Sequence, residues 1–224
     1  MKTVVISVGG SAIVPDKIDI TFLKNLKQSV AKLSKNNKLV IVCGGGKVAR
    51  DYIAATKPFH VPDSLACLAG IRTTKLNATL VSLVLRGNTD MPDSMPELKH
   101  ELKKRNVVIV GALGFQPNMT SDGDAAQIAH AVNADMFINL TDVDGLFDKN
   151  PKTHKDAKFI PEISFETFWG IASKIKFKAG QHFVLDQAGA KIIKQHKIKT
   201  IILKGLKNLE NSILGRSFKG TIIS

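Results

Sequence analysis

The stretch Leu39-Val40-Ile41-Val42-Cys43-Gly44-Gly45-Gly46-Lys47-Val48-Ala49-Arg50 decides the fold. Its five apolar residues are typical of a buried strand, and three glycines follow directly before a helix-like segment. Glycine lets the backbone approach an anion closely, and the free N–H groups at a helix start hold phosphate. The stretch therefore predicts a strand, a phosphate-binding turn and a helix that carries Arg50.

Two further strand ends repeat this design. At the N-terminus, residues 3–8 form an apolar run that leads into Gly9, Gly10 and Ser11. Residues 136–140 form another apolar run, which ends in Thr141-Asp142-Val143-Asp144-Gly145. Because the carboxyl ends of parallel strands meet at one edge of a sheet, the three turns predict one shared nucleotide site at that edge.

Apolar runs alternate with amphipathic helical segments along the chain, which predicts an α/β protein with a mainly parallel sheet. Thr21 is expected to cap a helix that ends at Asn36-Asn37, and residues 57–62 are expected to form a loop. Ser94 and Glu97 have the spacing of a capping box. Further helices are predicted over 64–85, from Asp122 to about Val132, from Ser164, and over 184–196, and further strands over 107–110 and 200–203.

The length of 224 residues fits one α/β domain made of two joined lobes, about 1–112 and 113–224. No apolar run reaches the roughly 18 residues of a membrane span, and the first run is too short for a secretory signal. We therefore expect a cytoplasmic protein without membrane contact. The net charge of +13 raises nucleic acid as a partner, but the lysines are dispersed and there is only one Trp and one Tyr, so we expect no such partner.

Several kinds of site are excluded by what the chain lacks. Cys43 and Cys67 give no disulfide framework, and the six histidines lack the spacing of metal ligands, so no protein metal site is expected. The sequence contains no Gly-x-x-x-x-Gly-Lys-Ser/Thr run and none of the protein-kinase loop motifs. A P-loop kinase and a protein kinase are therefore excluded.

The remaining polar residues suit phosphoryl transfer, which needs positioned N–H groups, cations and a metal ion. The two glycine turns offer backbone nests for anions, and Arg50 offers a charge-assisted contact to phosphate. Thr120-Ser121-Asp122 places two hydroxyls and a carboxylate at a helix start. The hydroxyls suit a monophosphate, and the carboxylate suits orienting a lysine or a magnesium-bound water.

Taken together, these motifs resemble the amino-acid-kinase superfamily, and most of all its archaeal-type uridylate kinase (UMP kinase) branch. The resemblance spans nearly the whole chain and rests on residues 8–11, 44–53, 70–78, 114–122, 141–152 and 178–193. It implies a three-layer α/β/α sandwich and transfer of the ATP γ-phosphoryl group to UMP with Mg²⁺, in pyrimidine nucleotide biosynthesis. It also implies a homo-oligomer, a hexamer built from dimers, with the acceptor bound by the N-terminal lobe and ATP by the C-terminal lobe.

The same resemblance assigns roles to individual positions. Asp122 and Arg50 are the expected catalytic residues. The expected ATP contacts are Gly10, Ser11, Gly46, Arg50, Thr141, Asp142, Phe147 and Asn150. The expected UMP contacts are Gly45, Cys67, Phe115, Gln116, Pro117, Asn118, Met119, Thr120 and Ser121.

Three positions depart from the pattern of the superfamily. Ser7 stands where many members carry a lysine on the first strand, and Lys47 or Lys178 are candidate replacements. Cys67 stands where an acidic residue usually recognises the acceptor nucleotide, with Asp63 one turn earlier. The third departure is Asn118, which replaces a glycine of the acceptor loop.

These departures keep two alternatives open. The first is a sister kinase of the same superfamily that phosphorylates another small acceptor. The second is a non-catalytic oxyanion-storage or regulatory protein, because residues 150–161 also resemble molybdenum-storage subunits. The intact glycine triplet and Arg50 favour a nucleotide enzyme over the storage protein.

Overall fold

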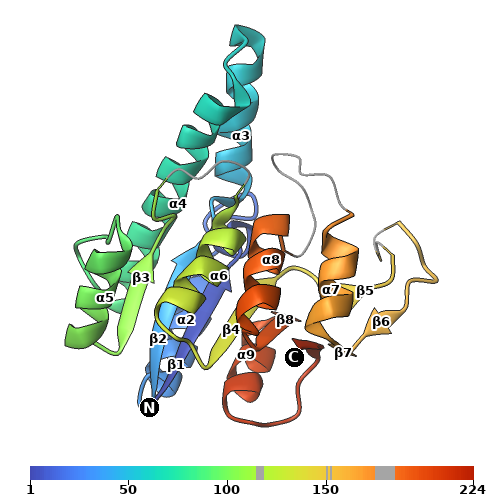
Figure 1. The fold of residues 1–224 in the computed structure, drawn as a ribbon. Coiled ribbons are helices and arrows are strands. Elements are labelled where there is room, and N and C mark those ends of the chain that lie inside the picture. The colour runs from blue at the N-terminus through green and yellow to red at the C-terminus, as the bar shows by residue number, and fades with distance from the viewer. Residues whose placement is uncertain (115–118, 150, 152, 175–184) are drawn as a thin grey trace.

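The computed structural model describes residues 1–114, 119–149, 151, 153–174 and 185–224. Its centre is a seven-stranded sheet in the order β3-β2-β1-β4-β8-β9-β7 (Figure 1). The first five of these strands are parallel, β9 runs antiparallel to β8, and β7 pairs parallel with β9. The strands are β1 (Lys2–Val8), β2 (Asn37–Cys43), β3 (Val107–Val110), β4 (Met136–Thr141), β7 (Glu162–Ile163), β8 (Thr200–Lys204) and β9 (Gly220–Ile223), beside a small antiparallel ribbon of β5 (Leu146–Phe147) and β6 (Phe159–Ile160).

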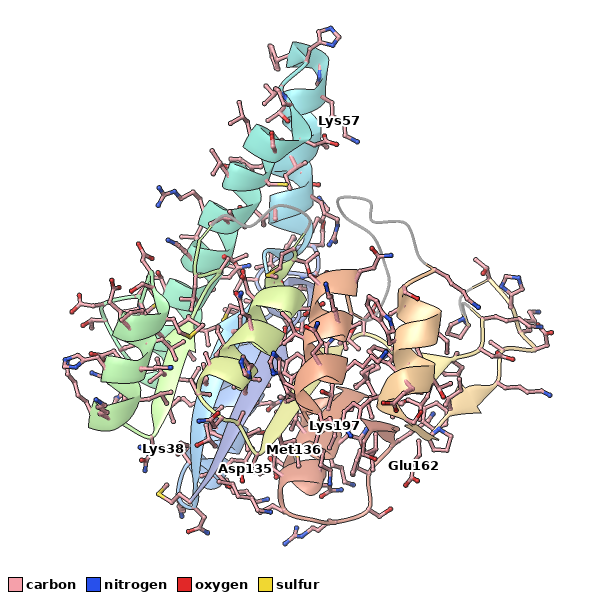
Figure 2. The ribbon with its side chains drawn as sticks, viewed as in Figure 1. Lys38, Lys57, Asp135, Met136, Glu162 and Lys197 are labelled. Atoms are coloured by element: carbon pink, nitrogen blue, oxygen red, sulfur yellow. The ribbon has the colours of Figure 1, made fainter. Side chains whose placement is uncertain are left out.

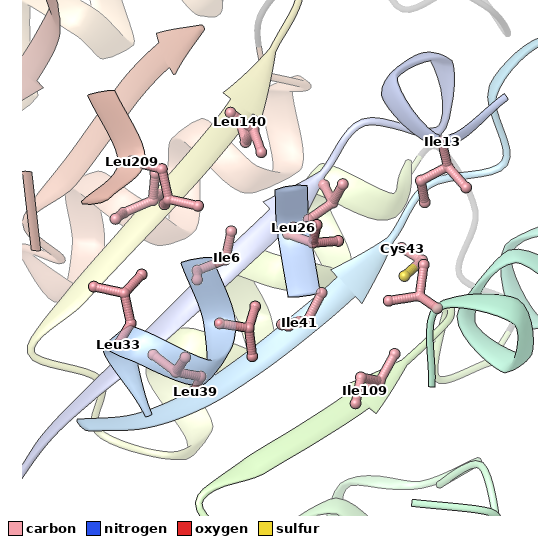
Figure 3. Close-up of a cluster of buried hydrophobic side chains, with 14 of the residues drawn as sticks. Ile6, Ile13, Leu26, Leu33, Leu39, Ile41, Cys43, Ile109, Leu140 and Leu209 are labelled. Carbon is pink, nitrogen blue, oxygen red and sulfur yellow. The ribbon is translucent and has the colours of Figure 1, made fainter. Parts of the chain in front are cut away.

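Helices cover both faces of this sheet, which confirms the predicted three-layer sandwich. On one face, α2, α9 and the C-terminal part of α4 cover the side of the sheet that includes Ile6 of β1 (Figure 3). On the other face, α5, α6, α7 and α8 cover the side that includes Val5 of β1. The helices are α1 (Gly10–Ile13), α2 (Ile20–Leu33), α3 (Gly46–Thr56), α4 (Asp63–Leu85), α5 (Met95–Lys104), α6 (Ser121–Ala131), α7 (Phe165–Ala172), α8 (Gln187–His196) and α9 (Leu206–Ile213).

One sheet runs through both halves of the chain. Residues up to Val110 supply β1, β2 and β3, and the later part of the chain supplies the other four strands. The buried run of β2 is apolar on both sides because both faces of a parallel sheet are covered. Within the described residues, no helix is long and apolar enough to span a bilayer.

Helix α3 and the first half of α4 project beyond the sheet as a helical hairpin (Figure 1). The predicted loop over 57–62 contains a short 3₁₀ turn, η1 (Lys57–Phe59), because Pro58 is preorganised for the start of such a turn. Figure 2 places Lys57 near the tip of the hairpin, while Lys38 and Lys197 lie toward the opposite end of the molecule. The hairpin and the rest of α4 carry large apolar side chains that stay exposed: Tyr52, Phe59, Leu65, Leu68, Leu76 and Leu83.

Some predicted helix ends are wrong by a few residues. Helix α2 begins at Ile20 because Asp19, and not Thr21, caps it: the Asp19 carboxylate accepts a hydrogen bond of 2.8 Å from the Phe22 N–H. The helix ends at Leu33, so Asn37 already belongs to β2. An apolar repeat locates a buried face well, but it does not choose between two neighbouring capping side chains.

Other predicted ends agree more closely. Ser94 caps α5, because its hydroxyl accepts a hydrogen bond from the Glu97 N–H. The Glu97 side chain accepts from the Asp93 N–H and not, as a capping box would require, from the Ser94 N–H. Helix α4 starts one residue before its predicted start. Helix α6 starts at Ser121, with Thr120 as its cap. In the described part of the predicted 184–196 helix, α8 starts at Gln187 and Asp186 caps it.

Candidate active site

The three predicted turns meet at one edge of the sheet. Strands β2, β1 and β4 are neighbours, so the turns after Cys43, Val8 and Thr141 lie side by side at their carboxyl ends (Figure 1). Backbone hydrogen bonds continue past the strands, from the Gly44 N–H to the Val8 carbonyl at 2.9 Å and from the Gly9 N–H to the Leu140 carbonyl at 3.1 Å. The prediction of one shared edge is confirmed.

The two glycine turns are in direct backbone contact. A Cβ atom on Gly10 would lie 2.1 Å from the Gly46 nitrogen, and one on Gly46 would lie 2.5 Å from the Gly10 carbonyl carbon. Gly46 also has a φ of +63°, in the left-handed region that glycine adopts without strain. Only glycines allow the starts of α1 and α3 to meet in this way, which brings the N–H groups of both turns to one place.

A cavity of about 1400 Å³ opens over these turns and between the hairpin and the second half of the chain. Most predicted site residues line it. Those are Gly10, Ser11, Gly45, Gly46, Arg50, Cys67, Met119, Thr120, Ser121, Asp122, Thr141, Asp142 and Phe147. The other predicted contacts, Phe115, Gln116, Pro117, Asn118 and Asn150, lie outside the described residues.

Arg50 sits one turn into α3, on the cavity wall. Its side chain is exposed, and its Nη2 lies 3.4 Å from the Ser11 hydroxyl oxygen. The guanidinium therefore spans the gap between the two glycine turns. A planar guanidinium in this position suits phosphate oxygens, which it contacts in a bidentate way.

Asp122 lies in the first turn of α6, against the sheet. Its carboxylate accepts a hydrogen bond of 2.7 Å from the hydroxyl of Ser7 on β1. Burial raises the pKa of the Asp122 carboxyl to about 6. The hydrogen bond from Ser7 lowers this pKa, and the charge of Asp186 raises it further. Ser7 is completely buried in the sheet, whereas Asp122 lines the cavity, so their hydrogen bond links the centre of the sheet to the cavity.

Asp186 holds the start of α6 in place, and the sequence analysis did not identify it. One of its carboxylate oxygens accepts hydrogen bonds from the Thr120 N–H (2.8 Å), the Thr120 hydroxyl (2.6 Å) and the Gly123 N–H (3.1 Å). The other oxygen caps α8 by accepting from the Gly189 N–H at 2.7 Å. Asp186 thus joins the first turns of two helices. Its position before a helix signals the cap, but no local pattern signals the contact with residue 120.

These contacts also change how Thr120 can act. Its hydroxyl donates to Asp186 and accepts from the Asp122 N–H at 3.2 Å. The neighbouring Ser121 hydroxyl lies against the glycine turn, since a Cβ on Gly44 would be 3.3 Å from it. Of the two predicted hydroxyls, Ser121 is therefore the better placed to reach a phosphate between the two segments.

The family follows from comparison of the sequence with known proteins. A model described as the amino acid kinase family matches residues 2–204. The chain belongs to the amino acid kinase family. A uridylate kinase of Thermococcus sibiricus is 33% identical over 225 residues and 98% of each chain is covered. A uridylate kinase of Archaeoglobus fulgidus is 32% identical over 223 residues, with 99% of each chain covered.

Solved structures agree with this assignment. The crystal structure of uridylate kinase from Archaeoglobus fulgidus matches with a TM-score of 0.88 and 31% identity, and both chains are covered completely. The crystal structure of UMP kinase from Ureaplasma parvum has a TM-score of 0.81 at 21% identity, which shows a shared fold. The amino-acid-kinase fold predicted from the motifs is confirmed.

The cavity of this amino acid kinase contains an acidic residue that the sequence analysis did not identify. Asp124 lines the cavity near Asp186 but is only 5% exposed, and within the described residues its Oδ1 has no hydrogen-bond partner. Burial, and then the charge of Asp186, raise the pKa of the Asp124 carboxyl to about 7. Asp122, Asp124 and Asp186 make this wall of the cavity acidic.

Cys67, the position that departs from the superfamily pattern, lies on α4 in the opposite wall. It is half-buried, and burial raises the pKa of its thiol, helped by the charge of Asp63. The cavity wall around it is formed by small and apolar residues, among them Ile53, Gly70 and Ile71. Asp63 is exposed and does not line the cavity, although its charge acts on the Cys67 thiol.

The far end of the cavity is formed by the second half of the chain. Thr141, Asp142 and Lys204 come from the ends of β4 and β8, and Phe147 comes from β5. The ring of Phe147 meets Phe159 of β6 edge to face, with centroids 5.5 Å apart. The β5–β6 ribbon thus presents an aromatic wall beside polar strand ends, which suits a nucleoside.

Proposed function

We propose that the protein is a UMP kinase, which transfers the γ-phosphoryl group of ATP to UMP and forms ADP and UDP. The observation that carries this proposal is the meeting of the two glycine turns, Arg50 and Asp122 in one cavity, in a chain about one-third identical to uridylate kinases over its whole length. The turns supply the anion-binding N–H groups that phosphoryl transfer needs, and the cavity has room for two nucleotides.

ATP would occupy the side of the cavity formed by the second half of the chain. Its nucleoside would lie against Thr141, Asp142 and Phe147, and its phosphates would reach the N–H groups of Gly10 and Gly46. Asn150 belongs to the same proposed set. This arrangement makes residues 113–224 the ATP side and residues 1–112 the acceptor side.

UMP would lie between the hairpin and the start of α6. Its phosphate would contact Gly45 and Ser121, and its nucleoside would extend toward Cys67 and the segment 115–119. An oxygen of the UMP phosphate would attack the γ-phosphorus of ATP while the bond from that phosphorus to the β-phosphate oxygen breaks. The enzyme forms no covalent bond in this step; Arg50 would stabilise the charge on the transferring group, and Asp122 would organise the groups around it.

Mg²⁺ is proposed as the companion of ATP. Within the described residues, no three His, Cys, Asp or Glu side chains are grouped so that they could hold a metal ion. Most of the ion's ligands would be phosphate oxygens and waters, with at most one or two carboxylates from the protein, as is usual for Mg²⁺ in kinases. The acidic wall around Asp122 is consistent with a cation that arrives with the nucleotide.

A second candidate function is a kinase of the same family that acts on another small acceptor. The observation that favours it is the small and apolar cavity wall around Cys67: among the described residues of this wall, none places a carboxylate in the cavity for the nucleoside of UMP. The test is ATP consumption with UMP, dUMP, CMP, AMP and simple phosphate or carboxylate acceptors. Turnover that is fastest with UMP supports a UMP kinase. Turnover with a different acceptor and none with UMP overturns it.

The same proposal includes a homo-oligomer, a hexamer as a trimer of dimers, in the cytoplasm. It is supported by the leucines of α4 that stay exposed, at 57% for Leu65, 66% for Leu76 and 67% for Leu83. Such a row of large apolar side chains on one helix is typical of a surface that another subunit covers. Neither nucleic acid nor membrane is a partner in this proposal.

A further inference from the structure

Ser7 places a hydroxyl in an otherwise apolar part of the sheet. It lies on β1 in register with Val42 of β2 and Asn139 of β4, on the face that buries Val5 beneath α6. The side chain has no exposed surface, and its hydroxyl donates to the Asp122 carboxylate at 2.7 Å. A buried hydroxyl with a short hydrogen bond to a carboxylate fixes the rotamer of both side chains.

The surroundings of Asp122 give Ser7 an unusual role. The charge that acts on the Asp122 carboxyl is that of Asp186, the cap of α8, and Asp124 lies two residues further along α6. Arg50 of α3 and Lys204 of β8 line the same cavity. Within the described residues, no lysine or arginine is paired with Asp122. Lys47, a candidate from the sequence, forms an ion pair of 2.6 Å with Asp51 instead, and Lys178 lies outside the described residues.

We propose that Ser7 is a positioning residue for phosphoryl transfer, whose hydroxyl holds the Asp122 carboxylate in one orientation. The inference rests on the proposed kinase function. Ser7 does not line the cavity, so it acts on the reaction only through Asp122. The transfer site of this enzyme is thus organised from the sheet by a hydrogen bond from an uncharged donor.

The physical basis is the competition between burial and hydrogen bonding. Burial and the neighbouring Asp186 favour the protonated carboxyl, whereas a hydrogen bond donated by Ser7 favours the carboxylate. Without the hydroxyl, Asp122 would hold its proton to a higher pH and would be free to change rotamer. Activity would then be lost mainly at low pH, and raising the pH would restore much of it.

The experiment compares the wild type with Ser7→Ala, Ser7→Thr and Ser82→Ala. Ser7→Ala removes the hydroxyl with little change in volume, and Ser7→Thr keeps it on a β-branched residue that suits a strand. Ser82 is the matched control, a buried serine whose hydroxyl donates at 2.6 Å to the Asn88 carbonyl and which does not line the cavity. Two quantities are measured: the Asp122 carboxyl pKa by carbon NMR without ligands, and kcat from pH 5 to 9 with ATP and UMP.

We expect Ser7→Ala to raise the pKa of Asp122 by about one unit. The pH at which kcat falls to half on the acidic side should rise by the same amount. At pH 6 this is roughly a fivefold loss of kcat, with almost no loss at pH 8.5. Ser7→Thr should restore the wild-type profile. The UMP phosphate itself titrates near pH 6, so kcat can fall at low pH in every variant. The decisive result is therefore the difference between the pH profiles of the variants.

An unchanged Asp122 pKa in Ser7→Ala would overturn the proposal. So would a kcat that falls equally at every pH, or an equal shift of the pH profile in Ser82→Ala, because both would indicate a general structural effect. If the wild type does not phosphorylate UMP, the proposed function fails separately, and the proposal that Ser7 positions a transfer residue fails with it. The NMR titration then still shows whether the Ser7 hydroxyl controls the carboxyl.

Discussion

Gly10 and Gly46 meet so closely that a Cβ atom on Gly10 would lie 2.1 Å from the Gly46 nitrogen. No side chain fits between these two backbones, and the neighbours of Gly10 at this contact are themselves backbone atoms, which cannot move aside. The contact is therefore a requirement of the site, because it sets the distance between the turn after β1 and the turn after β2.

Gly10→Ala should separate the two turns and weaken ATP binding by at least tenfold. It should also lower the free energy of unfolding by about 1–3 kcal/mol, as overpacking does. Gly170→Ala is the matched control, since a Cβ there meets nothing within 4 Å and alanine favours a helix. Calorimetric titration with ATP and urea unfolding measure the two effects. Wild-type ATP affinity in Gly10→Ala would show that the turns do not hold the nucleotide.

Asp186→Asn should loosen the start of α6 and reduce kcat. The carboxylate accepts four hydrogen bonds, three from residues 120 and 123 and one from Gly189, and an amide has one acceptor oxygen in place of two. A loss of about 2–4 kcal/mol in the free energy of unfolding is expected from broken hydrogen bonds to a charged group.

The control for this variant is Ser164→Asn, which also changes a capping residue, at the start of α7 and away from the cavity lining. Asparagine is about as good a cap as serine, so this variant should lose little stability and keep its kcat. Chemical unfolding and steady-state kinetics are the measurements. Equal losses in the two variants would show that Asp186 is an ordinary helix cap.

Asp124→Ala should stabilise the protein at pH 8. The pKa of Asp124 is about 7 in the folded protein and 3.8 ordinarily. The unfolded chain therefore loses this proton more easily, which lowers the free energy of unfolding as the pH rises. This loss of stability is absent below about pH 4, grows as the pH rises toward 7 and stays constant above it. The variant should therefore gain about 2–4 kcal/mol at pH 8 and nearly nothing at pH 4.

Urea unfolding at several pH values measures this gain. The exposed Asp90 serves as a control, since Asp90→Ala should leave stability unchanged at every pH. A gain of the same size at pH 4 and pH 8 would mean that helix propensity, and not the buried charge, explains the effect of Asp124→Ala.

Leu76→Glu should reduce the size of the assembly. Leu76 is 66% exposed on α4, in the row of leucines proposed as a subunit contact, and a buried unpaired carboxylate there would oppose association. Light scattering after gel filtration gives the mass. Leu214→Glu, at a leucine that is 39% exposed beyond α9, should not change it. A wild-type protein that is already a monomer would refute the proposed oligomer.

The parts of the fold that could be predicted depend on local patterns. The run 39–46 marks a strand and a turn by its own composition, and the common edge of three strand ends follows from the rules of parallel sheets. The apolar residues of α4 and the cap at Ser164 are also predicted by local sequence patterns, and both are observed. Helix α9 and strand β9 were not predicted, because the antiparallel return of β9 beside β8 leaves no local signal.

The parts of the site that could not be predicted are contacts between distant residues. Ser7 and Asp122 are 115 positions apart, and Thr120 and Asp186 are 66 apart. Resemblance to a family pointed to Asp122 and noted the serine as a missing lysine. Only the structure shows that the serine hydroxyl contacts the aspartate, since that contact depends on how α6 packs on β1.

The central claim is that this cavity transfers phosphate from ATP to UMP. The most direct test is to incubate the protein with magnesium, UMP and ATP labelled with ³²P at the γ-position, and to separate the nucleotides. We predict that the label moves to UDP, and that Arg50→Ala slows this transfer at least tenfold, as the loss of a charge-assisted phosphate contact implies. Label that stays in ATP, or that appears only as free phosphate, would contradict the claim.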